Sequence, residues 1–194
     1  AEVFRTYSGL IFMAASALTA LSKVFARIML ASAYYSAWEY MPTLVIATTF
    51  SAVTTFLGSI YMVKKKSVMS FLTSMFGAVI NVAICLLLIP RIGAQGAAVA
   101  AAVSYFIVFI IRAVNTQRYV RFDMNPSVLV LNGAVLLIQC IVMYTELPYW
   151  IVIESVCFVI MVALNAKPII RGIAMLLGGM KKMLGGRKNG GKNS

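Results

Sequence analysis

Six long apolar stretches constrain this chain more than any other feature of its sequence. A helix that crosses a bilayer needs about 20 mainly apolar residues. Six segments approach that length, namely Tyr7–Met29, Pro42–Val63, Val68–Ile89, Gly96–Ala113, Pro126–Thr145 and Trp150–Asn165. Only 11% of the residues are charged, whereas a soluble domain carries roughly 25%. The sequence therefore predicts an integral membrane protein.

These stretches are expected to be helices and not strands. An open strand inside lipid leaves its N–H and C=O groups unpaired, at a cost of several kcal/mol each. A barrel strand alternates apolar and polar residues, whereas a run such as Cys85–Ile89 is apolar throughout. We expect an all-α bundle of about six transmembrane helices over residues 1–166, with no linker long enough to suggest a second domain.

The basic residues predict the orientation, because cytoplasmic loops are enriched in Lys and Arg. With the N-terminus in the cytoplasm, 14 of the 17 basic residues fall on the cytoplasmic side, namely Arg5, Lys64–Lys66, Arg112, Arg118, Arg121 and seven residues of the tail. The other side keeps Lys23, Arg27 and Arg91. Both termini are thus expected in the cytoplasm. The same distribution accounts for the net charge of +12, so nucleic acid is not an expected partner.

Polar residues recur at helical spacing within three spans and place one small, hydroxyl-rich face on each helix. The first span contributes Ser8, Phe12, Ser16, Thr19, Lys23 and Arg27. The second contributes Thr48, Ser51, Thr55 and Ser59. The third contributes Ser70, Ser74, Gly77 and Asn81.

Two interpretations of these faces stay open. Small and hydroxyl side chains are the usual material of contacts between membrane helices, and Asn81 suits an interhelical hydrogen bond. The functional interpretation is a shared, water-filled cavity lined by candidate substrate-binding residues, namely Ser16, Thr19, Lys23, Arg27, Thr55 and Asn81. Lys23 and Arg27 lie near a helix end, so they can instead extend into the headgroup region. Glu154 can likewise reach the headgroups or pair with a cation of another helix.

Conventional catalytic chemistry has few candidate residues here. The sequence has no His, the commonest general base and metal ligand. Cys85, Cys140 and Cys157 lie singly within apolar spans, where small buried side chains are ordinary. None of the five acidic residues forms a close dyad with another in the sequence. We therefore expect no catalytic residue, no metal and no cofactor, and the chain is not expected to be an enzyme.

Two motifs resemble one family of transporters. The stretch Tyr34–Pro42 is similar to the loop before a helix in bacterial polysaccharide exporters. The stretch Asn81–Ala100, with Leu88-Ile89-Pro90, Gly93 and Gly96-Ala97-Ala98, is similar to a signature of the same proteins. In physical terms, Pro90 and Gly93 end one helix, and Gly96 with the following alanines lets the next helix pack closely. The resemblance covers about residues 8–120, and the last two helices match less clearly.

The family is the polysaccharide-type branch of the multidrug/oligosaccharidyl-lipid/polysaccharide exporter superfamily. The resemblance implies a carboxy-terminal half of a two-lobed bundle of twelve to fourteen helices in the bacterial cytoplasmic membrane. It also implies flipping or export of a lipid-linked oligosaccharide, with membrane lipid, that substrate and the amino-terminal half as partners. The alternatives are a membrane scaffold with packing faces only, or a polyprenyl-lipid transferase. Against the transferase, Asp123 alone does not make a metal site.

Residues 167–194 are expected to form a basic, amphipathic and partly disordered cytoplasmic tail. Apolar residues recur at helical spacing from Pro168 onward among Lys and Arg, which favours a helix in the inner headgroup layer. Gly172, Gly178 and Gly179 weaken any helix here, and the alternative is a solvated extension of the sixth span. The polar, Gly-rich segment from Arg187 to Ser194 is expected to be disordered.

The predicted orientation can be checked by cysteine labelling. A Cys at Tyr35 or Arg91 should react with an impermeant reagent added outside the cell, because both positions lie outside in this topology. A Cys at Lys65 should react only after the membrane is permeabilised. Labelling of Lys65→Cys from the outside would reverse the orientation.

Overall fold

The computed structural model describes residues 2–29, 37–119, 125–145 and 149–189, with side chains through Ala174 except those of Met29 and Ile173. The described residues form seven helices and no strand. The helices are α1 (Glu2–Ala20), α2 (Ser22–Met29), α3 (Met41–Val63), α4 (Ser67–Ile92), α5 (Ala94–Tyr119), α6 (Pro126–Thr145) and α7 (Trp150–Asn189).

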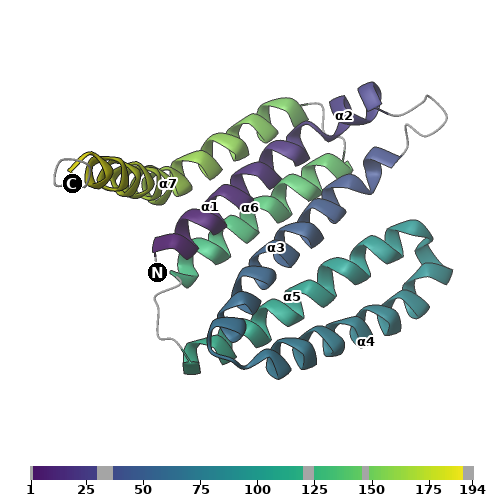
Figure 1. Ribbon diagram of the computed structural model, residues 1–194. Helices are drawn as coiled ribbons and strands as arrows, with labels where there is room; N and C mark the ends of the chain where they lie inside the picture. The colour runs from purple at the N-terminus through teal and green to yellow at the C-terminus, as the bar shows by residue number, and fades with distance from the viewer. Residues whose placement is uncertain (1, 30–36, 120–124, 146–148, 190–194) are drawn as a thin grey trace.

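Six of these helices are long and apolar enough to cross a membrane, which confirms the predicted all-α membrane bundle. Successive spans run in opposite directions, and α1, α6 and α7 lie together beside a second group made of α3, α5 and α4 (Figure 1). Two prolines stand where the sequence predicts helix starts. Pro42 lies in the first turn of α3, and Pro126 is the first residue of α6. A missing N–H costs nothing in a first turn, because that group has no partner within the helix.

The first predicted span differs from the structure at both ends. Helix α1 begins at Glu2 and ends at Ala20, and the separate helix α2 follows after Leu21. One face of the segment carries Leu21, Val24 and Ile28, all exposed, whereas Ser22 is buried. Such separation of apolar and polar faces is typical of a helix at the membrane surface. The span is present, and its bounds were predicted incorrectly because hydropathy alone does not locate a break between two consecutive helices.

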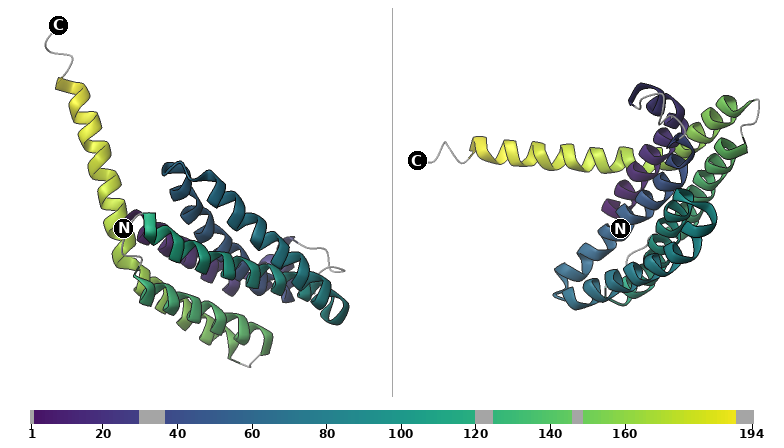
Figure 2. Two further views of the ribbon diagram at one scale, coloured as in Figure 1. Left: turned by 90° about the horizontal axis from the view of Figure 1, so that it is seen from below. Right: turned by 90° about the vertical axis from the view of Figure 1, so that its right-hand side faces the viewer.

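The last predicted span also continues beyond its expected end at Asn165. Helix α7 runs to Asn189, and its final part leaves the bundle (Figure 2). Pro168 lies inside this helix, where it removes one backbone hydrogen bond. The Thr6 hydroxyl of α1 donates to the Pro168 carbonyl at 2.9 Å. The backbone is therefore helical in part of the segment predicted to be disordered. Residues 190–194 lie outside the described residues, and the surface helix stays a prediction.

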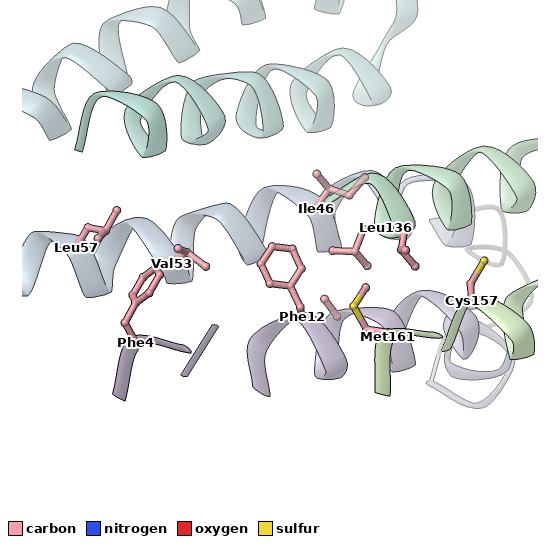
Figure 3. Close-up of a cluster of buried hydrophobic side chains, with 10 residues drawn as sticks. Phe4, Phe12, Ile46, Val53, Leu57, Leu136, Cys157 and Met161 are labelled. Carbon is pink, nitrogen blue, oxygen red and sulfur yellow. The ribbon is translucent and has the colours of Figure 1, made fainter. Parts of the chain in front are cut away.

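A core of large apolar side chains joins α1, α3, α6 and α7. Phe4 and Phe12 of α1 point toward α3, where Val53 and Leu57 are buried (Figure 3). Leu136 of α6 and Met161 of α7 complete the cluster. Buried side chains of this size fix the helices by close packing, since lipid tails are as apolar as the side chains themselves.

The second group is packed through glycines. A Cβ atom at Gly77 of α4 would collide with the Val108 side chain of α5. At Gly96, a Cβ would lie 2.7 Å from the Leu88 carbonyl carbon, so α5 crosses the backbone of α4 closely there. Gly93 has a φ of 58°, a conformation that favours glycine, and caps α4. The proposed physical roles of Gly93 and Gly96 are confirmed, although Pro90 lies inside the last turn of α4.

A pair of amides holds α6 against α7. Asn132 Nδ2 donates to Asn165 Oδ1 at 2.9 Å, and Asn165 Nδ2 donates back to Asn132 Oδ1 at 3.0 Å. Both side chains are 1% exposed. Each amide thus satisfies the other away from water, and α1 packs close to the pair because Gly9 faces Asn165.

Removing one member of this pair should destabilise the bundle. Asn165→Leu leaves the Asn132 amide without its partner, so we expect a loss of about 1–2 kcal/mol in the free energy of unfolding. Unfolding of the purified protein in mild detergent measures it, with Asn81→Leu as a control. The double variant Asn132→Leu/Asn165→Leu should lose less than the sum of the single changes. Additive losses would show that the two amides are not coupled.

Candidate functional site

Arg112 is a cation buried inside the membrane-spanning part of the bundle. It lies on α5 seven residues before Tyr119, and 5% of its surface is exposed. At a rise of about 1.5 Å per residue, it lies roughly 10 Å from the end of the helix. Side chains of a helix also lean toward its N-terminus, which directs the guanidinium further from that end. An ionisable residue at such a position is a candidate functional residue.

The guanidinium is solvated by oxygen atoms of α3 and α4. Arg112 Nε donates to Thr73 Oγ1 at 3.0 Å, and Nη1 donates to the Thr54 carbonyl at 2.9 Å. Nη2 donates to the Ser70 carbonyl at 3.0 Å and to Ser74 Oγ at 2.7 Å. Four of the five N–H groups of an arginine are therefore used. Every acceptor is neutral, and within the described part of the chain no carboxylate forms an ion pair with Arg112.

The sequence of α4 explains why this site forms. Ser70, Thr73 and Ser74 fall on one helix face, because residues three and four apart are neighbours on an α-helix. The single hydrogen of the Thr73 hydroxyl lies within reach of the carbonyls of Met69 and Ser70, each at 3.0 Å, so the hydroxyl is held in position. On α3, a Cβ at Gly58 would lie 2.6 Å from Arg112 Nη1. Glycine at 58 thus makes room for the guanidinium.

Arg112 lines a hollow of about 600 Å³ between α3, α4 and α5. The polar members of its wall are Ser51, Thr54, Thr55, Ser74, Asn81, Ser104, Tyr105 and Arg112. Thr55, Ser74 and Tyr105 are exposed at the surface of the bundle. The rest of the wall is apolar, from Gly77, Ala78, Val82, Ala101 and Val108, so the hollow combines polar groups that disfavour lipid contact with an apolar surface. The unbalanced charge of Arg112 makes the hollow electropositive.

Two of the predicted site residues line this hollow. Thr55 of α3 is exposed and bonds only its own helix, through the Ser51 carbonyl at 2.9 Å. Asn81 of α4 is half-buried and accepts a weak hydrogen bond from Cys85 Sγ at 3.7 Å. Both side chains thus have polar groups to offer a ligand.

The other four predicted residues lie elsewhere. Ser16 and Thr19 are fully buried in the packing of α1, and Thr19 donates to the Ala15 carbonyl at 3.0 Å. Lys23 Nζ lies 4.2 Å from the Trp38 ring centroid and 4.8 Å from that of Trp150. Arg27 is exposed on α2. The prediction of one shared cavity for the whole set is wrong, because the polar face of α1 packs against helices and its cations lie beyond the span.

Arg112 was counted with the basic residues on the cytoplasmic side, at the end of the predicted span Gly96–Ala113, and the structure places it inside α5 with a buried side chain. The residue fell at the end of a predicted span and was counted with Arg118 and Arg121 as part of a basic loop. One sequence signal could have indicated the burial of Arg112. Ser70, Thr73 and Ser74 recur at helical spacing on the neighbouring helix and offer oxygen ligands to a guanidinium. Thirteen basic residues still support the predicted asymmetry of charge.

Glu154 occupies neither of its two predicted positions, which were the headgroup region and an ion pair with a cation of another helix. It is 2% exposed, and its Oε2 accepts a hydrogen bond from Gln139 Nε2 of α6 at 2.8 Å. Among the described residues it forms no ion pair with Lys or Arg. Its side chain therefore points into the α6–α7 contact and not toward the headgroups.

Two further hollows have a different character. One of about 410 Å³ is lined almost entirely by apolar side chains of α1, α3, α5 and α6, including Phe50 and Phe106, which suits lipid chains. Another, of about 270 Å³, lies where the ends of α1 and α6 meet α7 and includes Arg5, Lys167 and Arg171. No group of three or more His, Cys, Asp or Glu that could hold a metal ion occurs among the residues that the structure describes.

Comparison of this chain with protein-family models, with curated proteins and with solved structures finds no match.

Water access to the hollow can be tested by cysteine chemistry in a background with Cys85, Cys140 and Cys157 replaced by Ala. A Cys at Thr55 or Ser74 should react with a charged, water-soluble thiol reagent, because both positions line the polar hollow. Val79→Cys is the control, since Val79 is exposed on α4 outside the hollow wall. Equal reactivity at all three positions would show that the hollow is no more hydrated than the lipid-facing surface.

Proposed function

We propose that this chain belongs to a membrane transporter that moves an anionic, lipid-linked oligosaccharide across the bacterial cytoplasmic membrane. The observation that carries the proposal is the position of Arg112. A guanidinium without a carboxylate partner in the described structure lies in the wall of a polar hollow inside the membrane-spanning bundle. An anionic headgroup that enters the hollow is attracted by this charge.

The geometry suits a phosphate or pyrophosphate group attached to a lipid. Arginine presents planar N–H donors that match phosphate oxygens, and Arg112 retains one N–H on Nη1 beyond its four hydrogen bonds. The hydroxyls of Ser51, Thr55 and Ser104 line the same wall and suit the hydroxyl groups of a sugar. The exposed side of α4 allows the lipid chain to stay in the bilayer while the headgroup occupies the hollow.

The second part of the proposal is that the hollow is one side of a larger site. Thr48 and Ser59 of α3 are exposed at membrane depth together with Thr55, and such a polar face is unfavourable against lipid tails. An amino-terminal half with similar helices, as the resemblance to polysaccharide exporters implies, would cover this face and complete a water-filled path. A scaffold without transport would use these faces for packing and would not need a hydrated, cationic hollow.

Flipping by the reconstituted protein tests the proposal. A fluorescent polyprenyl-pyrophosphate oligosaccharide is placed in one leaflet of vesicles, and its appearance in the other leaflet is followed. Arg112→Gln should lower the rate about tenfold or more, because it removes a charge-assisted contact worth at least about 1.4 kcal/mol. Arg118→Gln is the matched control on the same helix, since it removes the same charge from an exposed position.

Folding is separated from function by measuring the amount of inserted protein and its unfolding temperature for both variants. Arg112→Lys keeps the charge but loses the planar donors, so its rate should lie between those of the wild type and Arg112→Gln. An Arg112→Gln protein that folds normally and flips the substrate at the wild-type rate would contradict the proposal.

A further inference from the structure

Gln139 of α6 and Glu154 of α7 form a buried polar pair with an unsatisfied side. Gln139 is 0% exposed and Glu154 is 2% exposed. The one hydrogen bond between them runs from Gln139 Nε2 to Glu154 Oε2 at 2.8 Å. Within the described part of the chain, the second oxygen of each group, Gln139 Oε1 and Glu154 Oε1, has no hydrogen-bond partner. Two buried acceptors in adjacent groups thus lack a donor, which is costly away from water.

The same two helices, α6 and α7, carry another polar pair in which both hydrogen bonds between the side chains are formed. Asn132 and Asn165 exchange two hydrogen bonds, at 2.9 and 3.0 Å, so that every facing donor and acceptor is used. Gln139 follows Asn132 by seven residues, about two turns along α6. The second pair differs in one respect: an ionised carboxylate has no hydrogen to return, whereas an amide does.

The surroundings of Glu154 do not balance a negative charge. The neighbouring titratable groups on its own helix and on α6 are the thiols of Cys157 and Cys140, which supply no positive charge. The charged residues of α1, Glu2 and Arg5, lie near its beginning. The nearest cation on its own helix, Lys167, lies 13 residues away, about 20 Å along α7, and Lys23 of α2 has its ammonium group over the rings of Trp38 and Trp150. An ionised and unpaired carboxylate buried here would be strongly unfavourable.

We propose that Glu154 carries a proton, and that its O–H group donates to Gln139 Oε1. The acid and the amide then exchange two hydrogen bonds, as Asn132 and Asn165 do. The α6–α7 contact is therefore a proton-binding site. Release of the proton removes one hydrogen bond and leaves a bare carboxylate between the helices. Water must reach Glu154 to stabilise that charge, so proton release is linked to separation of α6 from α7 at this end of the bundle. This inference does not depend on the proposed transport function.

Infrared spectroscopy of the protein in lipid nanodiscs tests the proposal directly. At pH 7 the wild type should show a protonated-carboxyl stretching band that is absent from Glu154→Gln. Glu39→Gln, which removes an exposed carboxyl, should keep the band. Gln139→Met should keep the band but shift it to higher frequency, because the hydrogen bonds to the amide are lost. A carboxylate band in the wild type that disappears in Glu154→Gln would overturn the proposal.

A second measurement separates a proton from a metal ion and guards against misfolded variants. Replacing K⁺ by Na⁺ in the buffer should leave the wild-type band unchanged, whereas its loss in Na⁺ would show that the two oxygens bind sodium instead. Glu154→Gln should keep its unfolding temperature within about 2 °C of the wild type, because an amide at this position supplies the missing donor. A fall of about 8 °C or more would show that the charged carboxylate is required and contradict the inference.

Discussion

The burial of one guanidinium organises a large part of this structure. A charged arginine buried among membrane helices is costly unless it is hydrogen-bonded, so its N–H groups must find oxygen. Helices α3 and α4 supply it: the Thr54 and Ser70 carbonyls and the Thr73 and Ser74 hydroxyls each accept a hydrogen bond from Arg112. These contacts specify how three helices meet. They use four of its five N–H groups and leave its charge unbalanced within the described structure. This unbalanced charge is the basis of the proposed affinity for an anion.

In the other group of helices, buried polar side chains find their hydrogen-bond partners in amides. Between α6 and α7, Asn132 and Asn165 exchange two hydrogen bonds, whereas Gln139 and Glu154 do so only with an added proton. Arg112 lies on α5 and Glu154 on α7, and both are buried without an ion-pair partner among the residues described. A bundle with a fixed cation in one group and a protonatable acid in the other can in principle respond separately to an anion and to a proton. The apolar core of α1, α3, α6 and α7 joins the two groups (Figure 3).

Composition and run length were enough to predict the six spans, because the requirement to cross a bilayer leaves few alternatives. The roles of Gly93 and Gly96 were also predicted correctly, because a helix end and a close crossing of two helices can be recognised from the local sequence. The site was predicted only in part. Thr55 and Asn81 line the hollow, whereas the polar face of α1 packs against other helices. No local sequence pattern distinguishes a polar face that lines a hollow from one that packs between helices. The burial of Arg112 was missed because charge counting treats any arginine near a span end as part of a loop. Its acceptors come from residues 38 to 58 positions away, a relation that exists only in the folded bundle.

Arg112 is proposed to offer its charge to an anionic headgroup within the bundle. Solid-state NMR can measure the distance between arginine ¹⁵N nuclei and the ³¹P nuclei of a bound polyprenyl pyrophosphate. The bilayers are made of zwitterionic lipids that give no phosphate signal in the same spectral region. We expect strong ¹⁵N–³¹P coupling at hydrogen-bond range that disappears in Arg112→Lys and persists in Arg118→Lys. Coupling that is unaffected by Arg112→Lys, or that disappears only in Arg118→Lys, would contradict the proposal.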